Sequence, residues 1–270
     1  MSLISNKALP KNAENTPIVV ENLTMAYGEK VIQKNLNFTV NKGETCIIMG
    51  GSGCGKSTLM RHLVGLKMPA EGKVFLQGMS LWDAEEDERN RLLRHIGVMY
   101  QAGALWSSMT LEENLALPLQ RYTKLGKGEV SDMVALKLAL VGLAGFEGYY
   151  PSEISGGMQK RASIARAMAL DPDIVFFDEP SAGLDPITSR QLDELIIELR
   201  ESLHTTFVVV THELQSIFTI GTDSVFLDAQ TKTMIAQGHP KQLLEESDNP
   251  KVREFLSRGE TKKEQASYGG

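Results

Sequence analysis

Residues 50–58 read Gly-Gly-Ser-Gly-Cys-Gly-Lys-Ser-Thr, and this stretch limits the possible folds more than any other part of the chain. A short apolar run precedes it at 46–49, and apolar residues at helical spacing follow it at 59–64. The glycines therefore occupy the point where a buried strand turns into a helix, which is the setting of a P-loop. The pattern G-x-x-x-x-G-K-[ST] is satisfied by Gly50, Gly55, Lys56 and Ser57.

A P-loop binds phosphate because glycines let successive backbone N–H groups point at one anion, and the following helix adds positive charge at its N-terminus. Lys56 is expected to reach the β- and γ-phosphates, and the Ser57 hydroxyl is expected to ligate Mg²⁺. The alternative, a glycine-rich turn beside a surface lysine, does not account for the spacing and the flanks. The predicted phosphate-binding residues are Gly50, Gly51, Ser52, Gly53, Cys54, Gly55, Lys56, Ser57 and Thr58.

The bulk composition argues against some classes of protein. The formal net charge is −6, so the chain lacks the positively charged surface typical of a nucleic-acid-binding protein, and no nucleic-acid partner is expected. The two cysteines, Cys46 and Cys54, lie in the P-loop and its strand, which indicates free thiols in a reducing compartment. The sequence contains no run of about 18 apolar residues, so any membrane association is expected to come through a partner.

Hydrophobic patterning predicts an α/β fold. Alternation at 17–48 predicts a small antiparallel sheet that leads into the P-loop strand, with Tyr27 just before its turn. Continuous apolar runs at 174–177 and 207–210 are typical of buried parallel strands. We expect a flexible lead-in at 1–16, one domain at 17–240 with a helical subdomain inserted at about 103–165, and a short helical extension with a mobile tail at 241–270.

Four polar residues follow predicted strands, and the strand ends of α/β proteins converge where ligands bind. Asp178 and Glu179 come together after one strand, where the first carboxylate suits Mg²⁺ through a water and the second suits polarising an attacking water. Gln101 ends another strand and offers an amide for Mg²⁺, whereas the simpler interpretation is a polar loop residue. His212 ends a third strand and could contact a γ-phosphate, although a single histidine is more often structural.

These residues, in order, resemble the ATPase subunit of ABC transporters over roughly 17–240. The order is the P-loop, Gln101, Ile154-Ser155-Gly156-Gly157-Met158, Ile174 to Pro180, Ser181 to Asp185, and His212. The resemblance implies a P-loop NTPase with a RecA-like core, an N-terminal antiparallel β subdomain and an α-helical signature subdomain. It also implies hydrolysis of ATP with Mg²⁺. Ile154 and Met158 replace the usual Leu and Gln of the signature, but Ser-Gly-Gly is retained and activity is expected.

The resemblance assigns a role to each matched residue. Tyr27 stacks on the adenine, and Glu179 is the catalytic base. Ser155, Gly156 and Gly157 bind the γ-phosphate of ATP held by a second copy, which requires a head-to-tail homodimer. The remaining assignments are Gln101 as the Q-loop glutamine, Asp178 as the Walker B aspartate, Asp185 as the D-loop aspartate and His212 as the switch histidine.

A finer resemblance is to the ATPases of the Mla/Mce phospholipid transporters. It rests on the signature and on residues 101–106, 114–119, 185–188 and 249–256. It implies a location on the cytoplasmic side of the inner membrane, with a permease, a periplasmic Mce-domain protein and often a STAS-domain protein. The permease is expected to dock near Gln101–Leu119, although the apolar character of 105–119 fits simple core packing equally well.

Three other interpretations stay open at this point. The first is an ABC ATPase for another substrate, such as a polar solute. The second is a soluble ABC ATPase of translation or DNA repair, which the single ATPase unit and the short interval between Gln101 and Ser155 disfavour. The third is a nucleotide-dependent switch without turnover, against which Glu179 and His212 argue.

Overall fold

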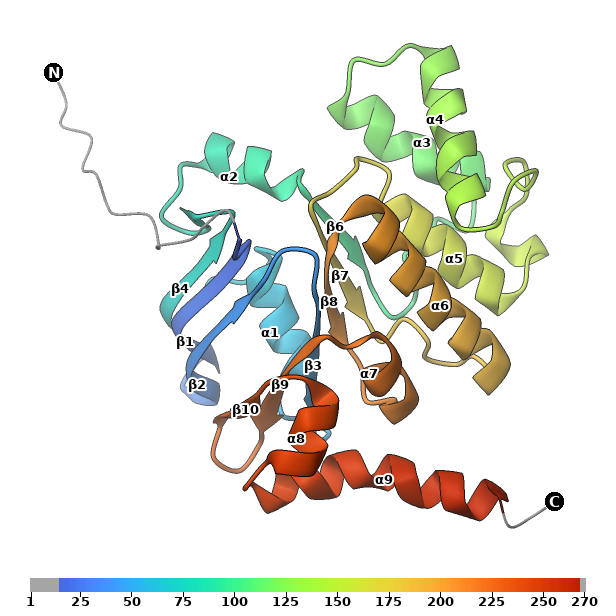
Figure 1. Ribbon diagram of the computed structural model, residues 1–270. Coiled ribbons are helices and arrows are strands. Elements are labelled where there is room, and N and C mark those ends of the chain that lie inside the picture. The colour runs from blue at the N-terminus through green and yellow to red at the C-terminus, as the bar shows by residue number, and fades with distance from the viewer. Residues whose placement is uncertain (1–14, 268–270) are drawn as a thin grey trace, which may run out of the picture.

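The computed structural model describes residues 15–267, so most of the predicted lead-in at 1–16 lies outside the described residues. Its centre is a six-stranded sheet in the order β10-β9-β3-β8-β7-β6 (Figure 1). All neighbouring strands in it run parallel except β9 and β10, which form an antiparallel pair. Its strands are β3 (Thr45–Gly50), β6 (Ile96–Met99), β7 (Ile174–Asp178), β8 (Thr206–Val210), β9 (Asp223–Asp228) and β10 (Thr233–Gln237).

The central strands are buried on both faces because helices cover one side and a second sheet covers the other. Alternate residues of one strand therefore enter two different cores. Ile47 and Met49 of β3 join the core that contains the helices after residue 110. Cys46 and Ile48 join the core on the opposite face. The continuous apolar runs predicted as buried parallel strands are confirmed.

The second sheet is antiparallel, with the order β2-β1-β4-β5. Together with α1 (Lys56–Leu63) it encloses the core on the Cys46 and Ile48 face. It confirms the predicted antiparallel β subdomain, and it also includes β4 and β5, which follow the P-loop in the chain. Its strands are β1 (Ile18–Tyr27), β2 (Lys30–Val40), β4 (Glu71–Leu76) and β5 (Met79–Ser80), and α2 (Glu86–Leu93) follows it along the chain.

Helices cover the other face, with α5 and α6 beside the sheet and α3 and α4 at the top right of Figure 1. Several helices, α3 and α6 among them, begin where side chains cap their free N–H groups. Thr110 and Glu113 form a reciprocal capping box at α3, and Asp185 accepts from two N–H groups at α6. The helices are α3 (Leu111–Tyr122), α4 (Lys127–Leu140), η1 (Pro151–Glu153), α5 (Gly156–Ala167), α6 (Pro186–Leu203) and α7 (Leu214–Ile220).

The C-terminal extension contains α8 (Pro240–Glu246) and α9 (Pro250–Ser267). Helix α9 runs to Ser267, so part of the predicted mobile tail is helical. The helix forms because apolar residues of its first turns pack into the core of the domain. Val252 and Leu256 are fully buried, and the ring of Phe255 meets Phe226 edge-on at 5.2 Å. No helix among the described residues has the length and apolarity needed to cross a bilayer.

Candidate nucleotide site

The P-loop backbone has the conformation that its glycines allow. Gly50 has a φ of 143°, and a Cβ there would lie 2.3 Å from the Leu227 carbonyl oxygen on β9. Gly55 has a φ of 101°, and a Cβ there would lie 2.7 Å from the Ile32 side chain on β2. No other residue type fits these two positions without strain. The loop is thus pressed against both sheets.

The side chains of the loop are arranged around its open face. Lys56 donates from Nζ to the carbonyl oxygens of Gly50 at 3.0 Å and Gly51 at 3.3 Å, so its ammonium lies over the loop. Cys54 is buried, and burial raises the pKa of its thiol, although the nearby Lys56 ammonium lowers it. The thiol therefore stays protonated, which argues against a reactive cysteine at this position.

Ser57 and Asp178 meet at the ends of α1 and β7. The Ser57 hydroxyl donates to Asp178 Oδ1 at 3.3 Å. Burial raises the pKa of Asp178, and the hydrogen bond from Ser57 acts in the opposite direction. A half-buried carboxylate beside a hydroxyl is a donor set of oxygen atoms that suits a hard divalent cation. These two residues therefore fit Mg²⁺.

Glu179 and His212 form a pair at the neighbouring strand ends. His212 Nδ1 lies 2.8 Å from Glu179 Oε1, and the carboxylate can only accept, so the ring proton is on Nδ1. Glu179 has a φ of 50°, a left-handed conformation that is uncommon for a residue with a side chain. Its other oxygen, Oε2, is buried without a hydrogen-bond partner among the described residues. Backbone strain and an unpartnered acceptor together are typical of a functional position.

Tyr27 lies beside the helix that follows the P-loop. Its ring is 46% exposed, and Lys67 Nζ lies 3.0 Å from the ring centroid. Hydrogen bonds with Thr58 and Arg61 lower the pKa of its hydroxyl. The structure thus places a half-exposed aromatic side chain near the loop, with Lys67 over one face of its ring, at the position where the sequence predicted an adenine contact.

Gln101 follows β6, whose last residue pairs with Phe177 next to Asp178. Its side chain is exposed, and its backbone carbonyl accepts from Lys160 Nζ of α5 at 2.6 Å. Gly103 lies against the same helix, since a Cβ there would come within 2.5 Å of Ser163 Oγ. The loop after β6 therefore rests on α5, a contact that the sequence did not reveal.

The predicted signature residues lie at the start of α5. Ser155 accepts from the Met158 N–H at 3.3 Å and caps the helix. A Cβ on Gly157 would lie 2.5 Å from Thr188 Cγ2 of α6, and the Thr188 hydroxyl donates to Asp185 Oδ2 at 2.5 Å. That hydrogen bond lowers the pKa of Asp185. The starts of α5 and α6 thus pack closely against each other at Gly157 and Thr188.

The P-loop helix and the signature helix cover opposite faces of the same sheet (Figure 1). Leu59 of α1 belongs to one core, and Ile164 of α5 belongs to the other. The structure brings together the P-loop, Ser57 with Asp178, and Glu179 with His212. No hydrogen bond or ion pair joins these described residues to Ser155–Gly157, whose two glycines lie against Leu184 and Thr188.

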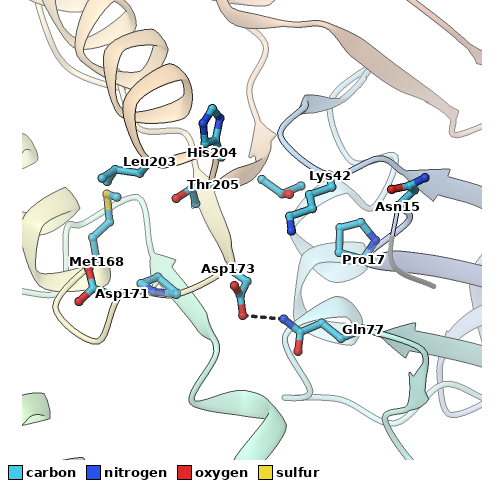
Figure 2. A pocket seen from close by; sticks show the side chains of 12 residues that line it. Asn15, Pro17, Lys42, Gln77, Met168, Asp171, Asp173, Leu203, His204 and Thr205 are labelled. Carbon is cyan, nitrogen blue, oxygen red and sulfur yellow. Dashed lines mark hydrogen bonds between the residues drawn. The ribbon is translucent and has the colours of Figure 1, made fainter. Parts of the chain in front are cut away.

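A cavity of about 760 Å³ lies elsewhere. Figure 2 shows it crossed by the hydrogen bond from Gln77 Nε2 to Asp173 Oδ2, which measures 2.7 Å. Asp173 precedes β7 and Thr206 begins β8, so the cavity opens at the start of these strands. Asp178 and His212 lie at the other end. The cavity is therefore separate from the cluster of predicted site residues.

Gln33 is the clearest contact residue that sequence reasoning missed. It lies in β2, is fully buried, and donates to carbonyl oxygens at Cys54 and Asp228. The only sequence signal is a polar residue at a core position of an alternating strand. Its second partner is 195 residues away in the chain, so no local pattern identifies it.

Comparisons with known proteins agree with this geometry. The family model described as "ABC transporter" matches residues 33–182. The probable ribonucleotide transport ATP-binding protein mkl of Mycobacterium bovis is 38% identical over 89% of this chain, which spans 66% of that protein's length. The intermembrane phospholipid transport system ATP-binding protein MlaF of Haemophilus influenzae is 39% identical over 88% of this chain and 89% of its own length.

A solved structure shows the same fold. The ATP-binding cassette MJ0796, in a dimeric post-hydrolysis state bound to ADP and Pi, superposes with a TM-score of 0.74. It is 31% identical and covers 82% of this chain and 98% of its own. The predicted combination of a P-loop core sheet with an antiparallel β subdomain is confirmed. The chain therefore belongs to the ABC transporter family, as one of its ATP-binding, ATP-hydrolysing proteins.

Proposed function

We propose that this chain is the ATPase subunit that powers phospholipid transport across the Gram-negative envelope through a separate permease. The observation that carries the ATPase part is the meeting of three elements at the carboxyl ends of β3, β7 and β8. These are the Lys56 ammonium over its loop, the Ser57–Asp178 contact and the Glu179–His212 pair.

ATP would bind along this edge of the sheet. The N–H groups of Gly50–Thr58 cradle the phosphates, Lys56 faces the β- and γ-phosphates, and the exposed ring of Tyr27 stacks on the adenine. Ser57, Asp178 and Gln101 would hold Mg²⁺, which neutralises phosphate charge when bound. Asp178 would do so through a water.

Hydrolysis requires a base that orients the attacking water. Glu179 is placed for this role because its Oε2 is buried and has no partner among residues 15–267. His212 holds the other carboxylate oxygen through Nδ1, and a contact from Nε2 to the γ-phosphate would require a second proton on the ring, at Nε2. The exposed His212 ring thus orients the buried Glu179 carboxylate, and that carboxylate would orient the water.

A second copy would complete the site. The start of α5, with Ser155, Gly156 and Gly157, is a helix end suited to an anion, and its glycines lie against Leu184 and Thr188 rather than against its own P-loop. A head-to-tail homodimer brings this helix end over the ATP of the other copy, with Asp185 at the same interface. The dimeric state of MJ0796 supports this arrangement.

The substrate is the finer part of the proposal. A phospholipid is favoured because MlaF of Haemophilus influenzae matches over 89% of its length, whereas mkl matches over 66%. Ribonucleotide is the second candidate because identity to mkl is 38%. The partners would be a permease docked near Gln101–Leu119, a periplasmic Mce-domain protein and a STAS-domain protein. The chain would then lie on the cytoplasmic side of the inner membrane, held there by the permease.

Purification of the native complex from membranes tests the substrate. Mass spectrometry should find an Mce-domain protein and bound phospholipid, whereas a periplasmic solute-binding protein would contradict the lipid assignment.

In that complex, Glu179→Gln should abolish ATP turnover and trap an ATP-loaded dimer. Unchanged turnover would refute the assigned base. Replacing both Leu105 and Trp106 with Asp should abolish co-purification of the permease while the subunit stays folded.

A further inference from the structure

We propose that Gln33 is a positioning residue for ATP binding, because its side-chain amide holds the back of the P-loop in the shape that receives phosphate. The inference rests on the proposed role of Gly50–Thr58 as the phosphate-binding loop. Gln33 lies in β2, outside the loop, and is fully buried.

The amide of Gln33 joins two separate segments. Nε2 donates to the Cys54 carbonyl oxygen at 2.7 Å and to the Asp228 carbonyl oxygen at 3.1 Å. An amide nitrogen has two hydrogens, and both are used. Turning the amide over would set Oε1 against two carbonyl oxygens, so the orientation is determined by its surroundings.

These two bonds close a ring around the loop. Gly50 pairs with Leu227 in the sheet, and Leu227 is followed by Asp228. Gln33 connects Asp228 back to Cys54, four residues beyond Gly50. The amide therefore sets the separation between the first glycine of the loop and Cys54.

The ring matters because a phosphate site needs N–H groups on its open face and carbonyl oxygens turned away from it. On the open face, Lys56 Nζ donates hydrogen bonds to the carbonyl oxygens of Gly50 and Gly51. Gln33 holds the Cys54 carbonyl against the β subdomain, behind the loop. Without that donor the Cys54 peptide is free to rotate, and ATP binding must then restrain it.

Gln33 also leaves Oε1 buried with no hydrogen-bond partner among the described residues. An unpartnered buried acceptor lowers the stability of a fold. A leucine or methionine of similar size would avoid this cost and pack in the same core. The presence of glutamine is therefore explained better by its link between Cys54 of the loop and Asp228 of β9 than by stability.

The test compares Gln33→Leu and Gln33→Met with the unchanged chain. ATP affinity is measured by calorimetric titration, and melting temperature is measured with and without ATP. Both variants should bind ATP roughly fivefold to tenfold more weakly, about the value of one hydrogen bond. The rise in melting temperature caused by ATP should shrink. In the assembled transporter, KM for ATP should increase and kcat should change less than twofold, because Glu179 and His212 are untouched.

Gln237→Leu is the matched control. Gln237 also bridges two segments, from Nε2 to the Thr39 carbonyl at 3.2 Å and to Asp223 Oδ2 at 3.0 Å, but it is exposed and does not contact the loop. It should leave ATP affinity unchanged. Lys56→Ala tests the underlying proposal, and normal ATP binding by it would refute the loop assignment itself.

The outcomes separate the two ideas. If Lys56→Ala loses ATP binding while both Gln33 variants bind ATP as tightly as the unchanged chain, the inference about Gln33 is wrong. If the Gln33 variants lower the melting temperature equally with and without ATP, Gln33 is only a structural residue. A selective loss of ATP affinity in both Gln33 variants, with Gln237→Leu normal, supports the inference.

Discussion

Asp193 is a buried acid that should make the stability of this domain depend on pH. It lies on α6, is 2% exposed, and faces α7, where the Ser216 hydroxyl donates to its Oδ2 at 2.9 Å. Burial raises the pKa of Asp193 from 3.8 to about 6, and the carboxylates of Glu213 and Glu194 add to the increase. The hydrogen bond from Ser216 lowers it but does not offset the burial.

The sign of the effect follows from which state binds the proton. Between pH 3.8 and about 6, Asp193 is ionised in the unfolded chain and still protonated in the folded one. The folded state binds more protons there, so the free energy of unfolding falls as pH rises through this window. A difference of about two pKa units corresponds to about 3 kcal/mol, and the loss is complete above pH 6.

Asp193→Asn should remove this loss. The Ser216 hydroxyl can still donate to the amide oxygen, and no charge has to be buried. Urea unfolding at pH 4, 6 and 8 should show a variant about as stable as the unchanged chain at pH 4 and up to about 3 kcal/mol more stable at pH 8. The difference between the two proteins isolates Asp193 from every other titrating group.

Ser216→Ala supplies the opposite control. It removes the hydroxyl that favours the ionised carboxylate, so the decrease in stability between pH 4 and 8 should become larger. A stability gap between Asp193→Asn and the unchanged chain that stays constant across this range would refute the reasoning.

Three further perturbations test contacts in the fold. Gly157→Ala should lower the free energy of unfolding by about 1–3 kcal/mol because the new Cβ would meet Thr188 Cγ2. Thr188→Ser deletes that methyl and keeps the hydroxyl, so it should restore much of the lost stability in a double-mutant cycle of thermal unfolding. Asp171→Asn should destabilise the protein by about 1–3 kcal/mol because it leaves the buried Lys137 ammonium without its counter-charge. Lys137→Met should be neutral or stabilising, and an equal loss of unfolding free energy in both variants would contradict this account. Lys251→Met should cost only about 0.5–1 kcal/mol at pH 7, since Lys251 is 42% exposed. The pKa of Asp228 is about 2 mainly through the Thr231 N–H, so acid titration of the Lys251 variant should still show stability lost as pH falls from 4 to 2.

The elements that could be predicted from sequence share a local cause. Buried strands such as β7 and β8 are continuous apolar runs, and the P-loop has a fixed spacing of glycines and lysine. Asp185 before Pro186 marks a helix start because the cap and the proline act on adjacent residues. In each case the residues that create the structure are neighbours in the chain.

The contacts that could not be predicted join distant segments. Glu179 and His212 were each proposed for the site, but neither the hydrogen bond between them nor the left-handed backbone of Glu179 has a sequence signal. Lys137 looks like a surface lysine on a helix, yet it is buried because Asp171 lies at the end of the segment after α5. The anchoring of α9 by Lys251 likewise depends on Asp228 of β9, which is brought close only by the folded sheet.

The sharing of each central strand between two cores restricts how the gene can change. A one-residue insertion in β7 would move every following side chain to the opposite face, so both cores would lose their apolar contacts at once. The same shift would displace Asp178 from Ser57 and Glu179 from His212. Insertions and deletions of single codons should therefore be tolerated in the loops and eliminated by selection in these strands, where stability and chemistry depend on one register.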